Sequence, residues 1–149
     1  MPDEPARAYF TLFNEIGILA QLSRSMFEAR LPPGMLVSHF SVLNHLIRVQ
    51  DGRTPLDLAR SFQVPKTTMT HTLATLEAAG LIETRLNPDD KRSKRVWITV
   101  DGRAFRNTAI DSLKPDLERL AERFPLSSVE AVLPTLAALR QVMDADRAS

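Results

Sequence analysis

The chain has 149 residues, of which 44% are hydrophobic and none is cysteine, so it can build a folded core but cannot form disulfides or cysteine-based metal sites. Its formal net charge is only +1, but residues 53–107 carry 10 basic and 6 acidic side chains, whereas both flanking segments are slightly acidic. The N-terminus has no signal-peptide pattern and no run of about 18 apolar residues occurs, so we expect a cytoplasmic protein without a membrane span.

The first predicted element is a long helix over residues 6–30, preceded by a loose arm with the sequence Pro-Asp-Glu-Pro. Its apolar side chains recur at helical spacing and form a stripe wider than one packing face needs. The helix is therefore expected to contact a second partner besides its own domain. The stripe consists of Phe10, Leu12, Phe13, Ile16, Leu19, Ala20, Met26 and Phe27.

Three shorter helices are predicted to follow. The first covers residues 38–50 and starts at Ser38. The second begins after Thr54, whose hydroxyl is a good N-cap, with a proline at its first position. The third covers residues 66–79 and stops at Gly80, a residue suited to the left-handed position after a helix.

Two short strands, residues 81–86 and 95–100, are then predicted to form a β-hairpin. The residues between them combine Asn-Pro-Asp-Asp turn chemistry with several cations, which predicts a long, charged tip. In the second strand, Val96, Ile98 and Val100 alternate with polar or amphipathic residues and are expected to anchor the hairpin to the core.

Two amphipathic helices, residues 102–124 and 128–145, complete the chain. Each contains a proline, which removes one backbone donor and should bend its helix. Ser127 and Glu130 have capping-box spacing at the start of the last helix.

This order of elements predicts a mainly α fold with a small β-hairpin, arranged as a winged helix-turn-helix. The third short helix should turn its apolar face inward and present hydroxyls and a cation that can contact bases and phosphates. The alternative is a merely solvated face rich in threonine, although exposed threonines lower helix propensity. The candidate recognition residues are Lys66, Thr67, Thr68, Thr70 and His71.

The run from "LARSFQVPKTTMTHTLATLEAAGLIETR" to "NPDDKRSKRVWITVDGRAF" resembles the MarR family of bacterial transcription regulators. In that family an Asp-x-Arg element lies in the wing and an "LT-x-x-G" step leads into the next helix. Asp90 and Arg92 supply the first element here, and "ITVDG" stands in place of the second. Where many members have arginine in the recognition helix, this chain has His71.

The resemblance implies a homodimeric repressor that binds a pseudo-palindromic site in double-stranded DNA. The expected divisions are an N-terminal arm and dimerisation helix (1–34), a winged helix-turn-helix (35–101) and C-terminal dimerisation helices (102–149). It implies that Arg92 enters or flanks the minor groove and that Asp90 holds it in place. The wing residues expected to face DNA are Asp90, Lys91, Arg92, Lys94 and Arg95.

Family members often bind small aromatic or phenolic effectors between the dimerisation helices and the DNA-binding domain. By position, such a crevice in this chain would involve Phe13, His39, Leu43, Phe105 and Ala109, which equally fit plain core positions. The sequence does not identify the effector.

Other functions have less support in the sequence. No catalytic triad or phosphate-binding glycine loop is recognisable, and His39 and His45 are six residues apart, which does not place two metal ligands on one helix face. We therefore expect no enzyme activity, cofactor or metal. A winged-helix adaptor that binds protein or RNA, or a purely structural dimer, remains an alternative.

Overall fold

The computed structural model describes residues 3–148. It divides into two compact units, of which the first contains α1 to α5 and the β-hairpin and the second contains α6 and α7. The predicted fold class, mainly helical with one small antiparallel hairpin, is confirmed. Within the described residues, no helix has an apolar stretch long enough to cross a membrane.

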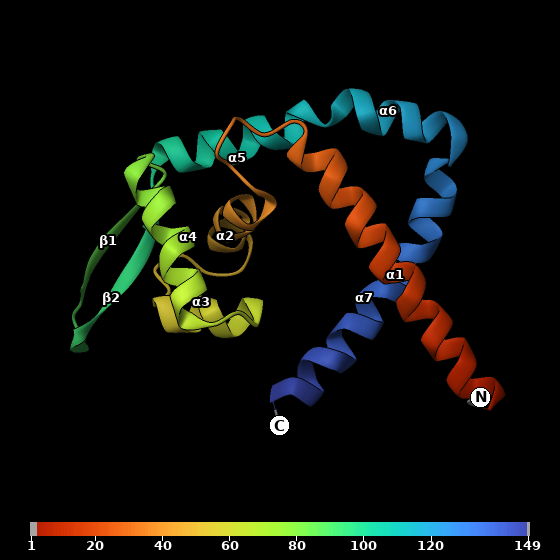
Figure 1. The fold of residues 1–149 in the computed structure, drawn as a ribbon, viewed down its shortest axis with the longest axis horizontal. Helices are drawn as coiled ribbons and strands as arrows, with labels where there is room; N and C mark the ends of the chain where they lie inside the picture. Colours follow the sequence, from red (N-terminus) through yellow and green to blue (C-terminus); the bar gives the residue numbers. More distant parts are fainter. Residues whose placement is uncertain (1–2, 149) are drawn as a thin grey trace. The chain divides into compact units, whose positions relative to one another are not determined.

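The core of the first unit lies among α2 (Val37–Arg48), α3 (Pro55–Phe62), α4 (Lys66–Ala78) and the hairpin. Figure 1 shows these three helices grouped on one side of the hairpin, whose turn lies at the end away from α5 (Val100–Ser112). The buried residues of this core cluster come from α2, α3, α4 and the hairpin region, and the partly buried Phe105 of α5 packs against them. They are Val42, Leu43, Leu46, Leu58, Ala59, Met69, Leu73, Leu76, Leu81, Ile82, Val96 and Ile98.

Helix α1 (Glu4–Glu28) starts earlier than the sequence predicts. The carboxylate of Asp3 accepts a hydrogen bond from the Ala6 amide at 3.1 Å, and Pro5 occupies the first turn, where its missing N–H has no cost. The expected loose arm is therefore wrong for residues 3–5, and its first residue, Pro2, lies outside the described residues. Much of the predicted apolar stripe is exposed within this chain, as in Phe10 and Leu19.

Helix α2 begins at Val37 rather than after a Ser38 cap. Two side chains accept from its first amides instead: Nδ1 of His39 accepts from the Leu36 amide at 2.8 Å, and Glu28 Oε1 accepts from the Val37 amide at 3.1 Å. Because Glu28 ends α1, the second bond joins these two helices. The Phe27 and Phe40 rings pack edge to face beside this junction, with centroids 4.5 Å apart.

The predicted ends of α3 and α4 are confirmed by their local geometry. Thr54 Oγ1 accepts from the Asp57 amide at 3.1 Å, which caps α3. Gln63 takes a left-handed conformation with φ 53°, and α4 begins three residues later. Gly80 has φ +75°, the conformation for which the sequence predicted a glycine.

The hairpin differs from its prediction at both ends. Strands β1 (Ile82–Asn87) and β2 (Asp90–Ile98) are joined by only two residues, so the long loop expected at the tip is wrong. The cations belong to β2 instead, because pairing resumes at Asn87 and Asp90 across an irregular register. Val96 and Ile98 are buried as expected, but Val100 starts α5 and is 84% exposed, so it does not anchor the hairpin.

The predicted helix over residues 102–124 is two helices, α5 and α6 (Lys114–Arg123). The break falls at Leu113, because Pro115 cannot donate the amide bond that would continue α5 through this point. Pro134, by contrast, stays inside α7 (Leu126–Ala148). The predicted Ser127 cap is wrong, since α7 begins one residue earlier and Ser127 lies in its first turn.

Candidate nucleic-acid interface

Helix α4 separates a buried face from an exposed one, as the sequence predicts. Met69, Leu73 and Leu76 are buried in the core of the first unit. The opposite face is open to solvent along the whole helix. Its exposed residues are Lys66, Thr67, Thr68, Thr70, His71, Ala74 and Glu77.

The threonines of α4 fall into two groups. The hydroxyl of Thr72 donates to the Thr68 carbonyl at 3.1 Å, and that of Thr75 donates to the His71 carbonyl at 3.3 Å, so both satisfy their donors within the helix. The other three, at positions 67, 68 and 70, are exposed. The threonines among the predicted recognition residues all belong to this exposed group.

The N-terminus of α4 is suited to an anionic group. The residue before the helix is Pro65, whose side chain has no hydrogen-bond acceptor, so it leaves the first amides of α4 to other acceptors. Lys66 adds a positive charge at the same end, where the helix dipole also favours an anion. A phosphate group satisfies both features.

The tip of the wing brings Asp90 and Arg92 together as the sequence resemblance implies. Asp90 Oδ1 accepts from the Arg92 amide at 3.0 Å and from Arg92 Nε at 3.5 Å. The second contact is long, and the Arg92 side chain is 93% exposed. The acid therefore orients the arginine without covering it, and Lys91 and Lys94 are exposed beside it.

Arg95 is held within the wing, whereas the sequence suggested a side chain free to reach phosphates. Its Nη2 lies 3.0 Å from Asp89 Oδ2, and its Nε donates to Asn87 Oδ1 at 3.3 Å. Only 34% of the side chain is exposed. The sequence shows the acidic and basic residues of the wing, but not which acidic side chain pairs with which basic one.

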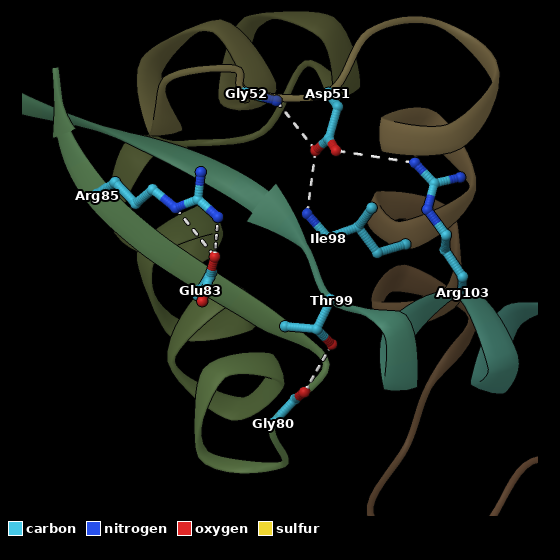
Figure 2. A network of polar contacts seen from close by, with 8 residues as sticks. All are labelled: Asp51, Gly52, Gly80, Glu83, Arg85, Ile98, Thr99 and Arg103. Atoms are coloured by element: carbon cyan, nitrogen blue, oxygen red, sulfur yellow. Dashed lines mark hydrogen bonds and ion pairs between the residues drawn. The ribbon is translucent and has the colours of Figure 1, made fainter. Parts of the chain in front are cut away.

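The base of the wing is fixed by Asp51, a residue that the sequence analysis did not select. Its Oδ1 accepts from the amides of Gly52 and Ile98, each at 3.0 Å, and its Oδ2 lies 3.9 Å from Arg103 Nη2 (Figure 2). One carboxylate thus joins the α2–α3 connection, the end of β2 and helix α5. An aspartate before a glycine predicts a turn. Its hydrogen bond to the Ile98 amide, 47 residues further along the chain, cannot be predicted from the local sequence.

Thr99 and Gly102 explain the "ITVDG" step structurally. The Thr99 hydroxyl donates to the Gly80 carbonyl at 2.7 Å (Figure 2). It also accepts from the Gly102 amide at 2.9 Å, so it ties α5 to the end of α4. A Cβ on Gly102 would overlap the Leu81 carbonyl oxygen. The position therefore requires glycine, and the step fixes where α5 leaves the wing.

On one face of the wing, Arg85 contacts both an acidic side chain and an aromatic ring. Arg85 pairs with Glu83 on the same strand (Figure 2), and its guanidinium lies 5.3 Å from the centroid of the Trp97 ring. A Cβ on Gly52 would overlap the Trp97 ring, and Gly52 also has φ +69°, so this position favours glycine for both reasons. Arg85 thus makes two contacts within the wing although its side chain is exposed, and the exposed cations at the tip are Lys91, Arg92 and Lys94.

His45 links α2 to the wing through Arg53. Arg53 Nη1 lies 3.0 Å from His45 Nε2, and because arginine can only donate, the histidine accepts at this nitrogen. The carbonyl of Arg53 accepts from the Val96 amide at 2.7 Å, which adds a bridge to β2. Burial, and secondarily the charge of Arg53, lower the pKa of His45 below 6.5 and keep the imidazole neutral in this contact.

The residues suggested for an effector crevice lie mainly in or beside the core. Leu43 and Ala109 are buried, Phe105 is partly buried against the core, and Phe13 is exposed on α1. His39 is buried and caps α2, and burial, with a smaller contribution from His71, lowers its pKa below 6.5.

Comparison with known proteins shows which family this chain resembles. Residues 34–93 match the model of the MarR family. The transcriptional regulator BldR from Sulfolobus solfataricus is 24% identical with a TM-score of 0.77, over 95% of this chain and 99% of that one. A MarR family regulator from Rhodococcus sp. RHA1 is 22% identical with a TM-score of 0.71, over 93% and 97%.

A third similar structure is that of a mutant MarR from E. coli complexed with operator DNA. It is 23% identical with a TM-score of 0.71, over 89% of this chain and 95% of that one. The matched segment 34–93 contains α2, α3, α4, β1 and the tip of the wing. The family model and the shared winged-helix fold confirm the resemblance of this chain to the MarR family of transcription regulators.

Proposed function

We propose that this protein is a homodimeric transcription regulator that binds a pseudo-palindromic site in double-stranded DNA. The observation that carries the proposal is the exposed face of α4, which combines Lys66 and three threonines with an N-terminus that has no side-chain cap. Small hydroxyl side chains fit into a major groove and hydrogen-bond base edges or phosphates without steric conflict. The similar MarR structure that contains operator DNA supports the same role for this fold.

The wing supports the proposal independently of α4. Lys91 and Arg92 are exposed at the tip, and Asp90 accepts from Arg92 without covering it. An arginine that is partly oriented before binding loses less side-chain freedom on binding and suits the narrow, electronegative minor groove. Two contact elements per protomer, a helix and a wing, fit a winged helix on duplex DNA better than a protein–protein adaptor.

The dimer is supported by exposed apolar side chains in both units. In the first unit, α1 exposes Tyr9, Phe10, Leu19 and Leu22. In the second unit, α6 and α7 expose many large apolar residues. An extensive apolar surface of this kind marks an interaction site, and a second copy of the chain would bury it. The residues concerned in α6 and α7 include Leu117, Leu120, Leu126, Val132, Leu133, Leu136, Val142 and Met143.

The proposed mode of action is repression that a small aromatic effector relieves, in a cytoplasmic setting. This part rests on the resemblance to the MarR family. The crevice proposed for the effector involves Phe13, His39, Leu43, Phe105 and Ala109, of which His39 carries the polar group. A ligand that displaced His39 from the α2 cap would act at the junction of α1 and α2, where Glu28 also binds.

Replacing Arg92 with alanine tests the wing directly. We expect Arg92→Ala to weaken binding to the best duplex selected from a random library by about 1–3 kcal/mol, because a groove arginine and its phosphate contacts are lost. Fluorescence anisotropy at fixed, moderate salt measures the change. Arg7→Ala is the matched control, since it removes the same charge from α1 and breaks an ion pair with Glu4 in which both side chains are exposed.

We expect the Arg7→Ala protein to bind within about twofold of the wild type, a surface change of less than about 0.5 kcal/mol. Equal losses in both variants would show that only net charge matters and would remove the assigned role of Arg92. An unchanged dissociation constant in Arg92→Ala would do the same. A thermal-shift scan with each variant checks that both remain folded.

A further inference from the structure

Asn87 is a buried polar residue at the exposed end of the wing. It is the last residue of β1 and only 8% of it is exposed, although its neighbours Leu86 and Pro88 are exposed. A buried side-chain amide is costly unless its donors and acceptor are satisfied. Its contacts therefore indicate what it does.

The Asn87 amide makes three hydrogen bonds, all within the tip. Its Oδ1 accepts from the Asp89 amide at 3.0 Å and from Arg95 Nε at 3.3 Å, and its Nδ2 donates to Ser93 Oγ at 3.0 Å. The Ser93 hydroxyl in turn donates a hydrogen bond to the Asp90 carbonyl oxygen at 3.3 Å. One side chain thus contacts the turn and two separate points of β2.

The register of the hairpin shows why these contacts matter. Leu86 pairs with Lys94, but Asn87 pairs with Asp90, so β2 has three extra residues between these two pairs. The three are Lys91, Arg92 and Ser93, which include two of the three exposed cations of the tip. Such a bulge lacks ladder hydrogen bonds and needs side-chain contacts to hold one conformation. The Asn87 amide spans this bulge from Asp89 to Ser93.

We propose that Asn87 is the positioning residue of the wing, fixing the bulge that presents Lys91 and Arg92 to the DNA backbone and groove. The effect of Asn87 on DNA affinity rests on the proposed DNA-binding function, whereas its hydrogen bonds across the bulge do not. Asparagine fits because a single side chain supplies both an acceptor for two donors and a donor for Ser93. Alanine removes all three bonds, and the two cations then lose their ordering before binding.

A double-mutant cycle tests this role. We expect Asn87→Ala to weaken binding to the selected duplex about tenfold, since two long side chains must then be ordered on binding. In a background that already carries Lys91→Ala and Arg92→Ala, the same change should weaken binding by less than about twofold, because its effect passes through those cations. Equal fold losses in the two backgrounds would overturn the positioning role.

Matched variants separate positioning from a general loss of structure. Leu86→Ala changes the preceding residue, whose side chain is 70% exposed, and should leave the affinity within about twofold. Ser93→Ala removes the bond from Nδ2 and the bond of its own hydroxyl to the Asp90 carbonyl, but keeps both bonds to Asn87 Oδ1, and should give a smaller loss than Asn87→Ala. An equal or greater loss for Leu86→Ala would contradict the assignment to Asn87.

Backbone relaxation measured by NMR on the free protein tests the geometry without DNA. Amides of residues 89–93 should have order parameters near those of the strands in the wild type, about 0.85, and fall toward about 0.6 in Asn87→Ala. Unchanged order parameters would overturn the proposal even if DNA affinity falls. If the wild type binds no duplex, the proposed function fails, while these order parameters still decide whether Asn87 orders the bulge.

Discussion

Deleting residues 126–149 is expected to give a monomer whose affinity for the full pseudo-palindromic site is about 10²–10⁴-fold below that of the wild type. The deletion removes α7 and with it the exposed apolar residues Leu133, Leu136 and Val142. A dimer binds its second half-site as an intramolecular step, and that gain in effective concentration is lost in a monomer. Multi-angle light scattering gives the oligomeric state, and anisotropy gives the affinity for full and half sites.

A point variant supports the deletion without shortening the chain. Leu133→Glu places a charge among the apolar residues of α7, and should shift the protein toward monomer, whereas Gln141→Glu adds the same charge at a polar, exposed position of that helix. A truncated chain that remains dimeric in light scattering would show that α7 does not carry the interface. The α1 stripe would then be the place to test next.

Replacing Gly102 with alanine is expected to lower the free energy of unfolding by about 1–3 kcal/mol, or more if the backbone cannot shift. The new Cβ would overlap the Leu81 carbonyl oxygen and lie 2.7 Å from Ile98 Cγ1. Relief requires α5 to move away from the base of the wing, which also breaks the contact of Thr99 with Gly80. Urea unfolding of wild type and variant at one protein concentration measures the difference, because dimer stability depends on concentration.

Ala104→Ser is the control for this change. It adds one atom to the same helix at an exposed position, where the expected effect is within about 0.5 kcal/mol. If Gly102→Ala were as stable as this control, the close approach of α5 to Leu81 would not hold. The observed role of the "ITVDG" step would then need another explanation.

The parts of the fold that depend on local chemistry could be predicted from the sequence. Thr54 with a following proline specified the start of α3, and Gly80 specified the end of α4, because each acts within a few residues of chain. The two faces of α4 followed from apolar spacing alone. The same rules failed at the first helix, where Asp3 was read as part of an arm although it could equally cap a helix.

The parts that depend on pairing across the chain could not be predicted. The extra residues in β2 are visible only once its register against β1 is known, and so are the partners of Asn87 and Arg95. Asp51 meets Ile98 at a distance of 47 residues along the sequence. The sequence therefore indicates where the charged wing lies, but not which of its charged side chains are held by contacts within the wing and which stay free to reach DNA.

The most direct test of the account is the salt dependence of duplex binding by the wild-type protein. If the four exposed cations of α4 and the wing tip, Lys66, Lys91, Arg92 and Lys94, each neutralise one phosphate, a dimer neutralises eight, which predicts a slope of log K against log salt of about −7. Anisotropy titrations between roughly 50 and 200 mM salt resolve such a slope. A slope near this value with a marked preference for the selected sequence is the predicted result. Absence of binding, or binding that salt does not weaken, would contradict the claim that α4 and the wing form a DNA-binding surface.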